Sequence, residues 1–163
     1  MMRAWYILST CGILVLLLSA CEKPSDGPDL NETITWMQRA LAEHNGQRID
    51  NTISSEVKII AKLTADHCKL SYELSDYDVV GFDLADIDPN SIKTEKIGNA
   101  VWATFKNRDY HHSTHYTHPK DPTGFKYDGD TGGFSLDSQE VATSFSKALS
   151  RAVRLCGGKP STF

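Results

Sequence analysis

The sequence lacks every short motif that would specify a familiar reaction. Its 163 residues contain no G-x-S-x-G nucleophile elbow, no H-E-x-x-H zinc-protease motif, no phosphate-binding loop, no C-x-x-C pair and no dinucleotide-binding glycine pattern. No repeat with the period of a solenoid is visible either. The absence of these motifs favours a non-enzymatic module. A hydrolase whose site is assembled only by folding is an alternative.

The chain also lacks an excess of positive charge. It contains 17 Lys and Arg against 21 Asp and Glu, which gives a formal net charge of −4. Nucleic-acid-binding domains usually present a clustered basic face, so this balance argues against a nucleic-acid partner. The charged fraction of 23% and the hydrophobic fraction of 40% are typical of a globular domain.

Long hydrophobic runs are absent except near the N-terminus. Arg3 precedes an apolar stretch that includes Ile13-Leu14-Val15-Leu16-Leu17-Leu18 and ends at Leu18-Ser19-Ala20-Cys21. A positive start, an apolar centre and small residues at a boundary are typical of a secretory signal peptide, so residues 1–20 are expected to be removed. The alternative is an uncleaved transmembrane anchor over residues 4–20, because the stretch approaches the length that spans a bilayer.

The end of this stretch resembles the lipobox of bacterial lipoproteins. A large aliphatic residue, Leu18, stands three positions before Cys21, with small residues between them. The motif needs a cysteine because the thiol takes a diacylglyceryl group as a thioether. The resemblance implies that Cys21 becomes a lipid-carrying N-terminus and that the domain faces outward from the cytoplasm on a membrane. Glu22, rather than Asp, at the next position favours the outer membrane where a cell has two.

One domain is expected to follow this anchor. Residues 21–30 contain two prolines and a glycine among polar residues, which is typical of a flexible tether. Arg3 is the only charged residue before position 21, so the rest of the chain has 16 basic and 21 acidic residues. Residues 31–163 are long enough to bury a core of their own as a single α+β domain.

Hydrophobic periodicity predicts a helix, several strands and a second helix. Apolar residues recur at helical spacing behind a predicted cap at Asn31 or Thr33, and again from Val141 to Cys156 behind Asp137-Ser138. Alternating apolar positions predict strands near residues 57–63, 68–75, 80–84, 92–97, 100–105 and 133–136.

The expected fold is therefore α+β, with an N-terminal helix, a bent antiparallel sheet of about four to six strands and a closing C-terminal amphipathic helix. This order resembles a PH-like barrel, in which a final helix plugs one end of a bent sheet, over roughly residues 50–158. The segment Leu155-Cys156-Gly157-Gly158-Lys159 also resembles the end of a small envelope domain found on bacterial lipoproteins. That likeness implies no particular activity.

Two cysteines remain after the leader and the anchor. Cys11 lies in the leader and Cys21 is the predicted lipid site, which leaves Cys68 and Cys156. An even pair in an exported domain favours a disulfide, which would pin the last helix to the sheet. The alternative is that both are small hydrophobic residues buried in the core.

Four of the six histidines fall in one segment, which lies in a predicted long loop over residues 107–132. Imidazoles with nearby carboxylates are the ligands that zinc, copper and nickel prefer. The candidate metal ligands are His111, His112, His115 and His118. The alternative is a polar excursion whose histidines are solvated. Asp128-Gly129-Asp130 lacks the further acidic positions of a calcium loop, so a glycine-rich turn is expected there.

Together these patterns predict a membrane-tethered lipoprotein of the cell envelope with a non-enzymatic binding or scaffold role. Its expected partners are the lipid bilayer, through Cys21, and an envelope protein. A metal-binding lipoprotein that uses the histidine segment, with zinc or another transition metal as its cofactor, is the first alternative. A hydrolase is the second.

Overall fold

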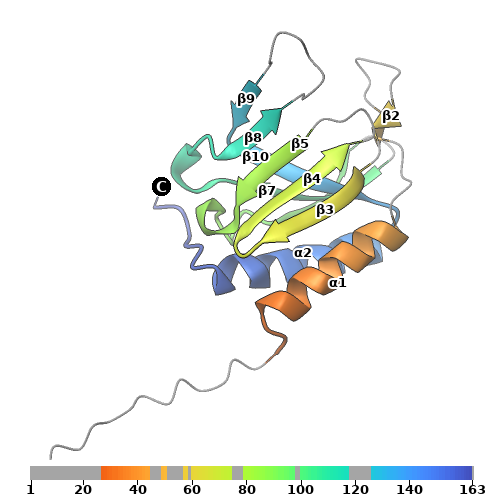
Figure 1. Cartoon of the computed structure of the whole chain (residues 1–163), viewed down its shortest axis with the longest axis horizontal. Coiled ribbons are helices and arrows are strands. Elements are labelled where there is room, and N and C mark those ends of the chain that lie inside the picture. The colour runs from red at the N-terminus through yellow and green to blue at the C-terminus, as the bar shows by residue number, and fades with distance from the viewer. Residues whose placement is uncertain are drawn as a thin grey trace, which may run out of the picture.

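The computed structural model describes residues 27–44, 49–50, 57–58, 60–74, 79–97, 100–117 and 126–162. The predicted leader, Cys21 and most of the tether lie outside these ranges. The helices are α1 (Leu30–Glu43) and α2 (Gln139–Leu155), and the 3-10 helices are η1 (Leu84–Asp86) and η2 (Arg108–Tyr110). The strands (Figure 1) are β1 (Ile49–Asp50), β2 (Val57–Lys58), β3 (Ile60–Asp66), β4 (Lys69–Leu74), β5 (Val79–Asp83), β6 (Lys93–Ile97), β7 (Ala100–Lys106), β8 (Thr114–Thr117), β9 (Lys126–Gly129) and β10 (Thr131–Leu136).

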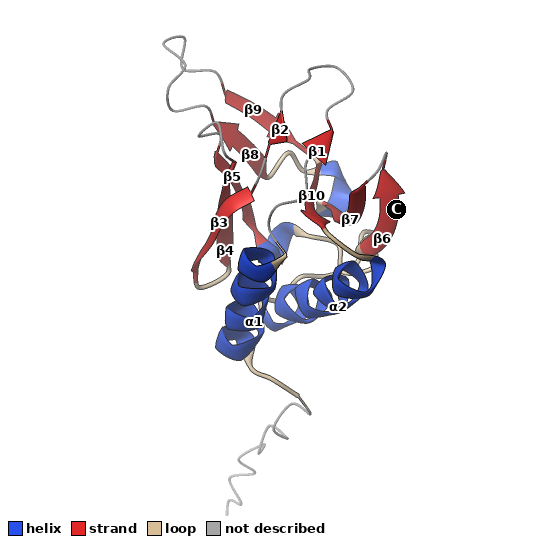
Figure 2. Ribbon diagram, turned by 90° about the vertical axis from the view of Figure 1, so that its right-hand side faces the viewer, coloured by secondary structure: helices blue, strands red, loops and turns tan. Residues whose placement is uncertain are grey.

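The strands form two main antiparallel sheets. One sheet has five strands in the order β3-β4-β5-β8-β9, the other has three in the order β10-β7-β6, and β1 pairs with β2 separately. Figure 2 shows the two main sheets on either side, with both helices beneath them. The predicted α+β class with its two helices is confirmed. The expected barrel is wrong, because in the part of the chain that the structure describes the sheets do not close on each other.

The chain crosses from the five-stranded sheet to the three-stranded sheet at Asp130. β9 ends at Gly129 and pairs with β8, whereas β10 begins at Thr131 and pairs with β7. The backbone N–H of Asn107 donates to the carbonyl oxygen of Asp130 at 2.7 Å, which holds the crossing point. The predicted glycine-rich turn is thus a passage between two sheets and not a hairpin within one.

Both helices begin with a side-chain cap. Asp29 Oδ1 accepts from the backbone N–H of Glu32 at 2.8 Å, and Glu32 Oε2 accepts from the backbone N–H of Asp29 at 3.1 Å. This reciprocal pair is a capping box, which neither Asn31 nor Thr33 can form because an apolar residue lies three positions after each. The predicted caps are therefore wrong, and the last two residues of the predicted tether belong to the start of α1.

Ser138 caps α2, with its Oγ accepting from the backbone N–H of Val141 at 3.3 Å. The neighbouring Asp137 accepts instead from His44 Nδ1 at 2.5 Å, and this contact joins the end of α1 to the start of α2. None of the helices within the described ranges is long and apolar enough to cross a membrane.

The core is built around Phe134 of β10, which is fully buried. Its ring centroid lies 5.2 Å from that of Tyr72 in β4 and 4.9 Å from that of Phe145 in α2. Phe82 of β5 contacts it at 5.8 Å, and Phe82 in turn lies 4.9 Å from Phe105 of β7. One aromatic cluster therefore packs both sheets and the last helix together.

A disulfide joins Cys68, in the turn between β3 and β4, to Cys156 at the C-terminal cap of α2. The two Cα atoms are 5.7 Å apart and the residues are 88 positions apart in sequence. The bond fixes the end of α2 to the β3–β4 hairpin, which is the connection that the sequence favoured.

A glycine in β10 is required by the packing of a neighbouring ring. A Cβ atom at Gly132 would lie 2.3 Å from Cζ of Phe105, whereas a Cβ atom at Gly81 in β5 would meet nothing closer than 3.9 Å. We expect Gly132→Ala to lower the free energy of unfolding by about 1–3 kcal/mol, because a buried ring must move. Gly81→Ala, the matched control, should change it by less than about 1 kcal/mol. Urea denaturation measures both, and equal effects would contradict this assignment.

The disulfide closes a long loop and should contribute strongly to stability. We expect Cys68→Ala/Cys156→Ala to lower the free energy of unfolding by about 4–5 kcal/mol, because the reduced unfolded chain gains loop entropy. Reduction of the wild-type protein should give the same denaturation midpoint as this variant. Mass mapping of a digest made without reductant should find the two cysteine peptides linked. Recovery of both as free thiols would contradict the bond.

Candidate binding cleft and the histidine segment

A cleft of about 450 Å³ lies between the two sheets. Tyr72, Val80 and Tyr116 line it from the five-stranded sheet. The three-stranded sheet supplies most of the other side, with Lys93, Glu95, Ile97, Trp102, Thr104, Phe105, Lys106, Thr131, Gly132 and Gly133.

Two tyrosines bridge the sheets at the base of the cleft. The hydroxyl of Tyr72 donates to the backbone carbonyl oxygen of Gly133 at 3.3 Å. The hydroxyl of Tyr116 donates to the backbone carbonyl oxygen of Thr131 at 3.2 Å. Burial raises the pKa of Tyr72 well above its ordinary value, so its hydroxyl stays protonated as a donor. Both acceptors belong to the outer edge of β10, and the tyrosines satisfy carbonyl groups that no described strand neighbours.

The mouth of the cleft carries charges of both signs. Lys93 Nζ lies 2.6 Å from Glu95 Oε2, and the hydroxyl of Thr104 donates to Glu95 Oε1 at 2.8 Å. The hydrogen bond from Lys93, followed by that from Thr104, lowers the pKa of Glu95. Trp102, the strand partner of Glu95, is half-buried, and Ile97 is 51% exposed. An apolar surface is thus open to solvent beside an ordered ion pair.

The cleft is suited to binding an apolar group. Trp102 and Tyr116, both half-buried, provide ring surface, while the Glu95 carboxylate and the Lys93 and Lys106 ammonium groups stand at or near the mouth to orient a ligand. The described lining residues include no histidine and no cysteine. Ser91 is engaged, since its Oγ donates to Asp88 O at 2.7 Å and accepts from the backbone N–H of Lys106 at 2.8 Å. The arrangement offers contact area for an apolar group and charged groups that can orient it.

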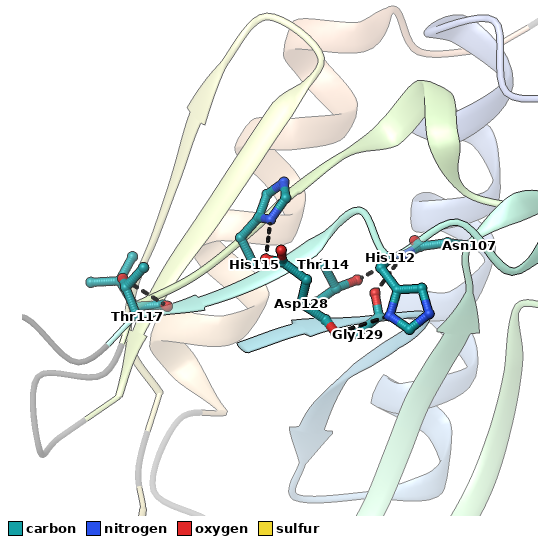
Figure 3. A network of polar contacts seen from close by, with 8 residues as sticks. Asn107, His112, Thr114, His115, Thr117, Asp128 and Gly129 are labelled. Carbon is teal, nitrogen blue, oxygen red and sulfur yellow. Dashed lines mark hydrogen bonds and ion pairs between the residues drawn. The ribbon is translucent and has the colours of Figure 1, made fainter. Parts of the chain in front are cut away.

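The histidine segment is divided between a loop and a strand. His111 and His112 follow η2, and His115 lies in β8. His115 Nδ1 donates to Asp128 Oδ1 at 2.7 Å, whereas His112 Nδ1 donates to the backbone carbonyl oxygen of Asp128 at 3.0 Å, so Asp128 lies between the two rings (Figure 3). All three histidines are exposed.

These contacts do not gather a metal site. The described residues contain no group of three or more histidine, cysteine, aspartate or glutamate side chains placed to hold an ion. His118, the fourth predicted ligand, lies outside the described residues. The structure thus brings two of the candidate histidines to one aspartate without converging them on a common point.

The expected long loop over residues 107–132 is wrong where the chain forms β8, β9 and the first two residues of β10. A buried polar network holds them there: Asn107 Nδ2 donates to Thr114 Oγ1 at 3.0 Å and to the carbonyl oxygen of Gly129 at 3.1 Å. Thr114 is fully buried although it is polar, whereas its neighbour His115 faces outward. Because both residues are polar, the sequence shows no alternation of apolar and polar residues that would predict a strand here.

Sequence reasoning did not find the cleft. Its residues come from strands that are distant in the chain, and each of them resembles an ordinary strand residue on its own. The only local signal was Trp102, which falls on the opposite strand face from Ala103 and Phe105, where a large aromatic ring is unusual for a solvent-facing position. Comparison of the chain with protein-family models, curated proteins and solved structures finds no match.

Proposed function

We propose that this protein is a lipoprotein of the cell envelope, anchored through acylated Cys21, whose domain binds an apolar group of its partner in the cleft between the sheets. The observation that carries the binding role is the open, ring-lined cleft with an ordered Lys93–Glu95 pair at its mouth. Its volume of about 450 Å³ is that of a small-ligand pocket. It also suits one or two large side chains of an envelope protein.

Two observations support the proposed location in the cell envelope. The leader that ends at Leu18-Ser19-Ala20-Cys21 has the form of a lipoprotein signal. The Cys68–Cys156 disulfide is consistent with an oxidising compartment outside the cytoplasm, where such bonds form and persist. A tether then presents the cleft to partners in the envelope.

Removal of the ring at the mouth should weaken binding. We expect Trp102→Ala to bind the neutral probe N-phenyl-1-naphthylamine about five- to thirtyfold more weakly, because stacking and buried area worth about 1–2 kcal/mol are lost. Fluorescence titration measures the affinity. Leu155→Ala is the control, since it removes an exposed apolar side chain outside the lining of the cleft. If Trp102→Ala binds the probe as well as the wild type does, the cleft is not the binding site.

The anchor has its own test. We expect the full chain, expressed in a bacterium with a radiolabelled fatty acid, to incorporate label, and Cys21→Ser to abolish incorporation, because the thiol is the point of attachment. Cys11→Ser, the matched control in the leader, should leave incorporation unchanged. Mass spectrometry of the wild type should find the mature N-terminus at an acylated Cys21. An unmodified residue at position 21 would contradict the anchor whatever the cleft binds.

A further inference from the structure

A second hollow, of about 850 Å³, runs along the outer side of the two helices. We call it the helix groove, and its lining includes Trp36 and Arg39 of α1 and Lys147 and Arg151 of α2. It shares no residue with the cleft between the sheets. Figure 1 shows the helices at the end of the domain where the chain enters from its N-terminal side.

The helix groove is positively charged, although the chain as a whole is acidic. Its described lining holds three cations and one carboxylate, Glu32, which is already engaged in the capping box of α1. Arg39 and Lys147 are exposed, and neither has an ion-pair partner among the residues that the structure describes. Unpaired cations at the surface of an acidic domain indicate an anionic partner.

A tryptophan lies within the same groove. Trp36 packs on Phe145 with the ring centroids 6.3 Å apart, but it remains half-buried. Its indole N–H has no hydrogen-bond partner in the described part of the chain. An indole with one apolar side and one free donor is suited to the headgroup level of a bilayer, where tryptophan is enriched.

The path of the chain places this groove next to the predicted anchor. Arg151 Nε donates to the carbonyl oxygen of Pro28 at 2.5 Å, so the entering segment runs along the rim of the groove. Only six residue steps separate Cys21 from Gly27, and a chain of that length spans at most about 20 Å. A lipid on Cys21 would therefore keep the groove within reach of the membrane surface.

We infer that the helix groove is the membrane-facing surface of the domain and that its occupants are the headgroups of anionic phospholipids. This inference rests on the proposed anchor at Cys21. Guanidinium and ammonium groups donate to phosphate oxygens, and the Trp36 indole inserts at the same depth. Docking by the helices leaves the cleft between the sheets open to a partner.

The tryptophans allow the two surfaces to be observed separately. The full chain contains Trp5, Trp36 and Trp102, so Trp5→Phe/Trp102→Phe leaves an indole only in the helix groove and Trp5→Phe/Trp36→Phe leaves one only in the cleft. Each variant is extracted from membranes and reconstituted into vesicles of phosphatidylcholine, with or without phosphatidylglycerol, that contain brominated lipid. Bromine quenches an indole that contacts the bilayer. We expect quenching of Trp36 in the anionic vesicles, its reversal by high salt, and none for Trp102.

A charge variant then tests the cause. In the Trp36-only background, Arg39→Gln/Lys147→Gln should weaken docking about thirtyfold, because each cation near an anionic surface contributes about fivefold. Lys62→Gln/Lys126→Gln, which removes two exposed lysines of the five-stranded sheet, should leave docking unchanged. Circular dichroism of each variant verifies the fold.

The outcomes separate the docking surface from the anchor. Acylated protein whose Trp36 is not quenched, or is quenched equally with and without phosphatidylglycerol, overturns the docking surface and leaves the anchor intact. A finding that the extracted protein carries no acyl groups overturns the anchor at Cys21. In that case, quenching of Trp36 by added vesicles still decides whether the helix groove binds anionic lipid. If Lys62→Gln/Lys126→Gln weakens docking as much as Arg39→Gln/Lys147→Gln does, the binding depends on overall charge. That result would overturn the helix groove as the docking surface.

Discussion

The fold depends on the burial of Phe134 between two sheets that, within the described residues, share no hydrogen-bonded strand pair. Its ring contacts Tyr72 from one sheet and Phe145 from α2, and its own strand belongs to the other sheet. Without a continuous ladder, this packing fixes the relative positions of the sheets together with side-chain hydrogen bonds such as those from Tyr72 and Tyr116. Gly132, in the same strand, lets the Phe105 ring pack against the backbone and so extends the cluster. This aromatic packing therefore replaces the backbone hydrogen bonds that would close a barrel.

The same arrangement produces the cleft. β10 is an edge strand, and an edge strand carries carbonyl groups that would bind another strand. Tyr72 and Tyr116 reach across from the other sheet and donate to two of these carbonyl groups. The hydroxyls satisfy the edge while holding the backbones apart by the length of a side chain. What remains between the sheets is the cleft, so its presence is a direct result of the way the edge is satisfied.

The sequence predicted the parts of this structure that depend on local pattern. Periodicity alone placed α2, and alternation placed β4, β5, β6 and β7 to within a residue or two. It could not predict that the chain changes sheets at Asp130, because that depends on a backbone contact with Asn107 from a distant segment. It also missed β8, where the buried position is a threonine whose burial depends on Asn107. The cleft was missed for the same reason, since its walls meet only after both sheets have formed.

The position of α2 links these features to the direction from which the chain enters. Near its C-terminal end, Arg151 binds the carbonyl oxygen of Pro28 and Cys156 is bonded to the β3–β4 hairpin. Tyr72 lies in that hairpin and lines the cleft. A short covalent and hydrogen-bonded path therefore runs from the entering segment through α2 to the wall of the cleft. Because each step is a fixed contact, the orientation of the cleft relative to the segment that enters at Gly27 is set by the folded domain.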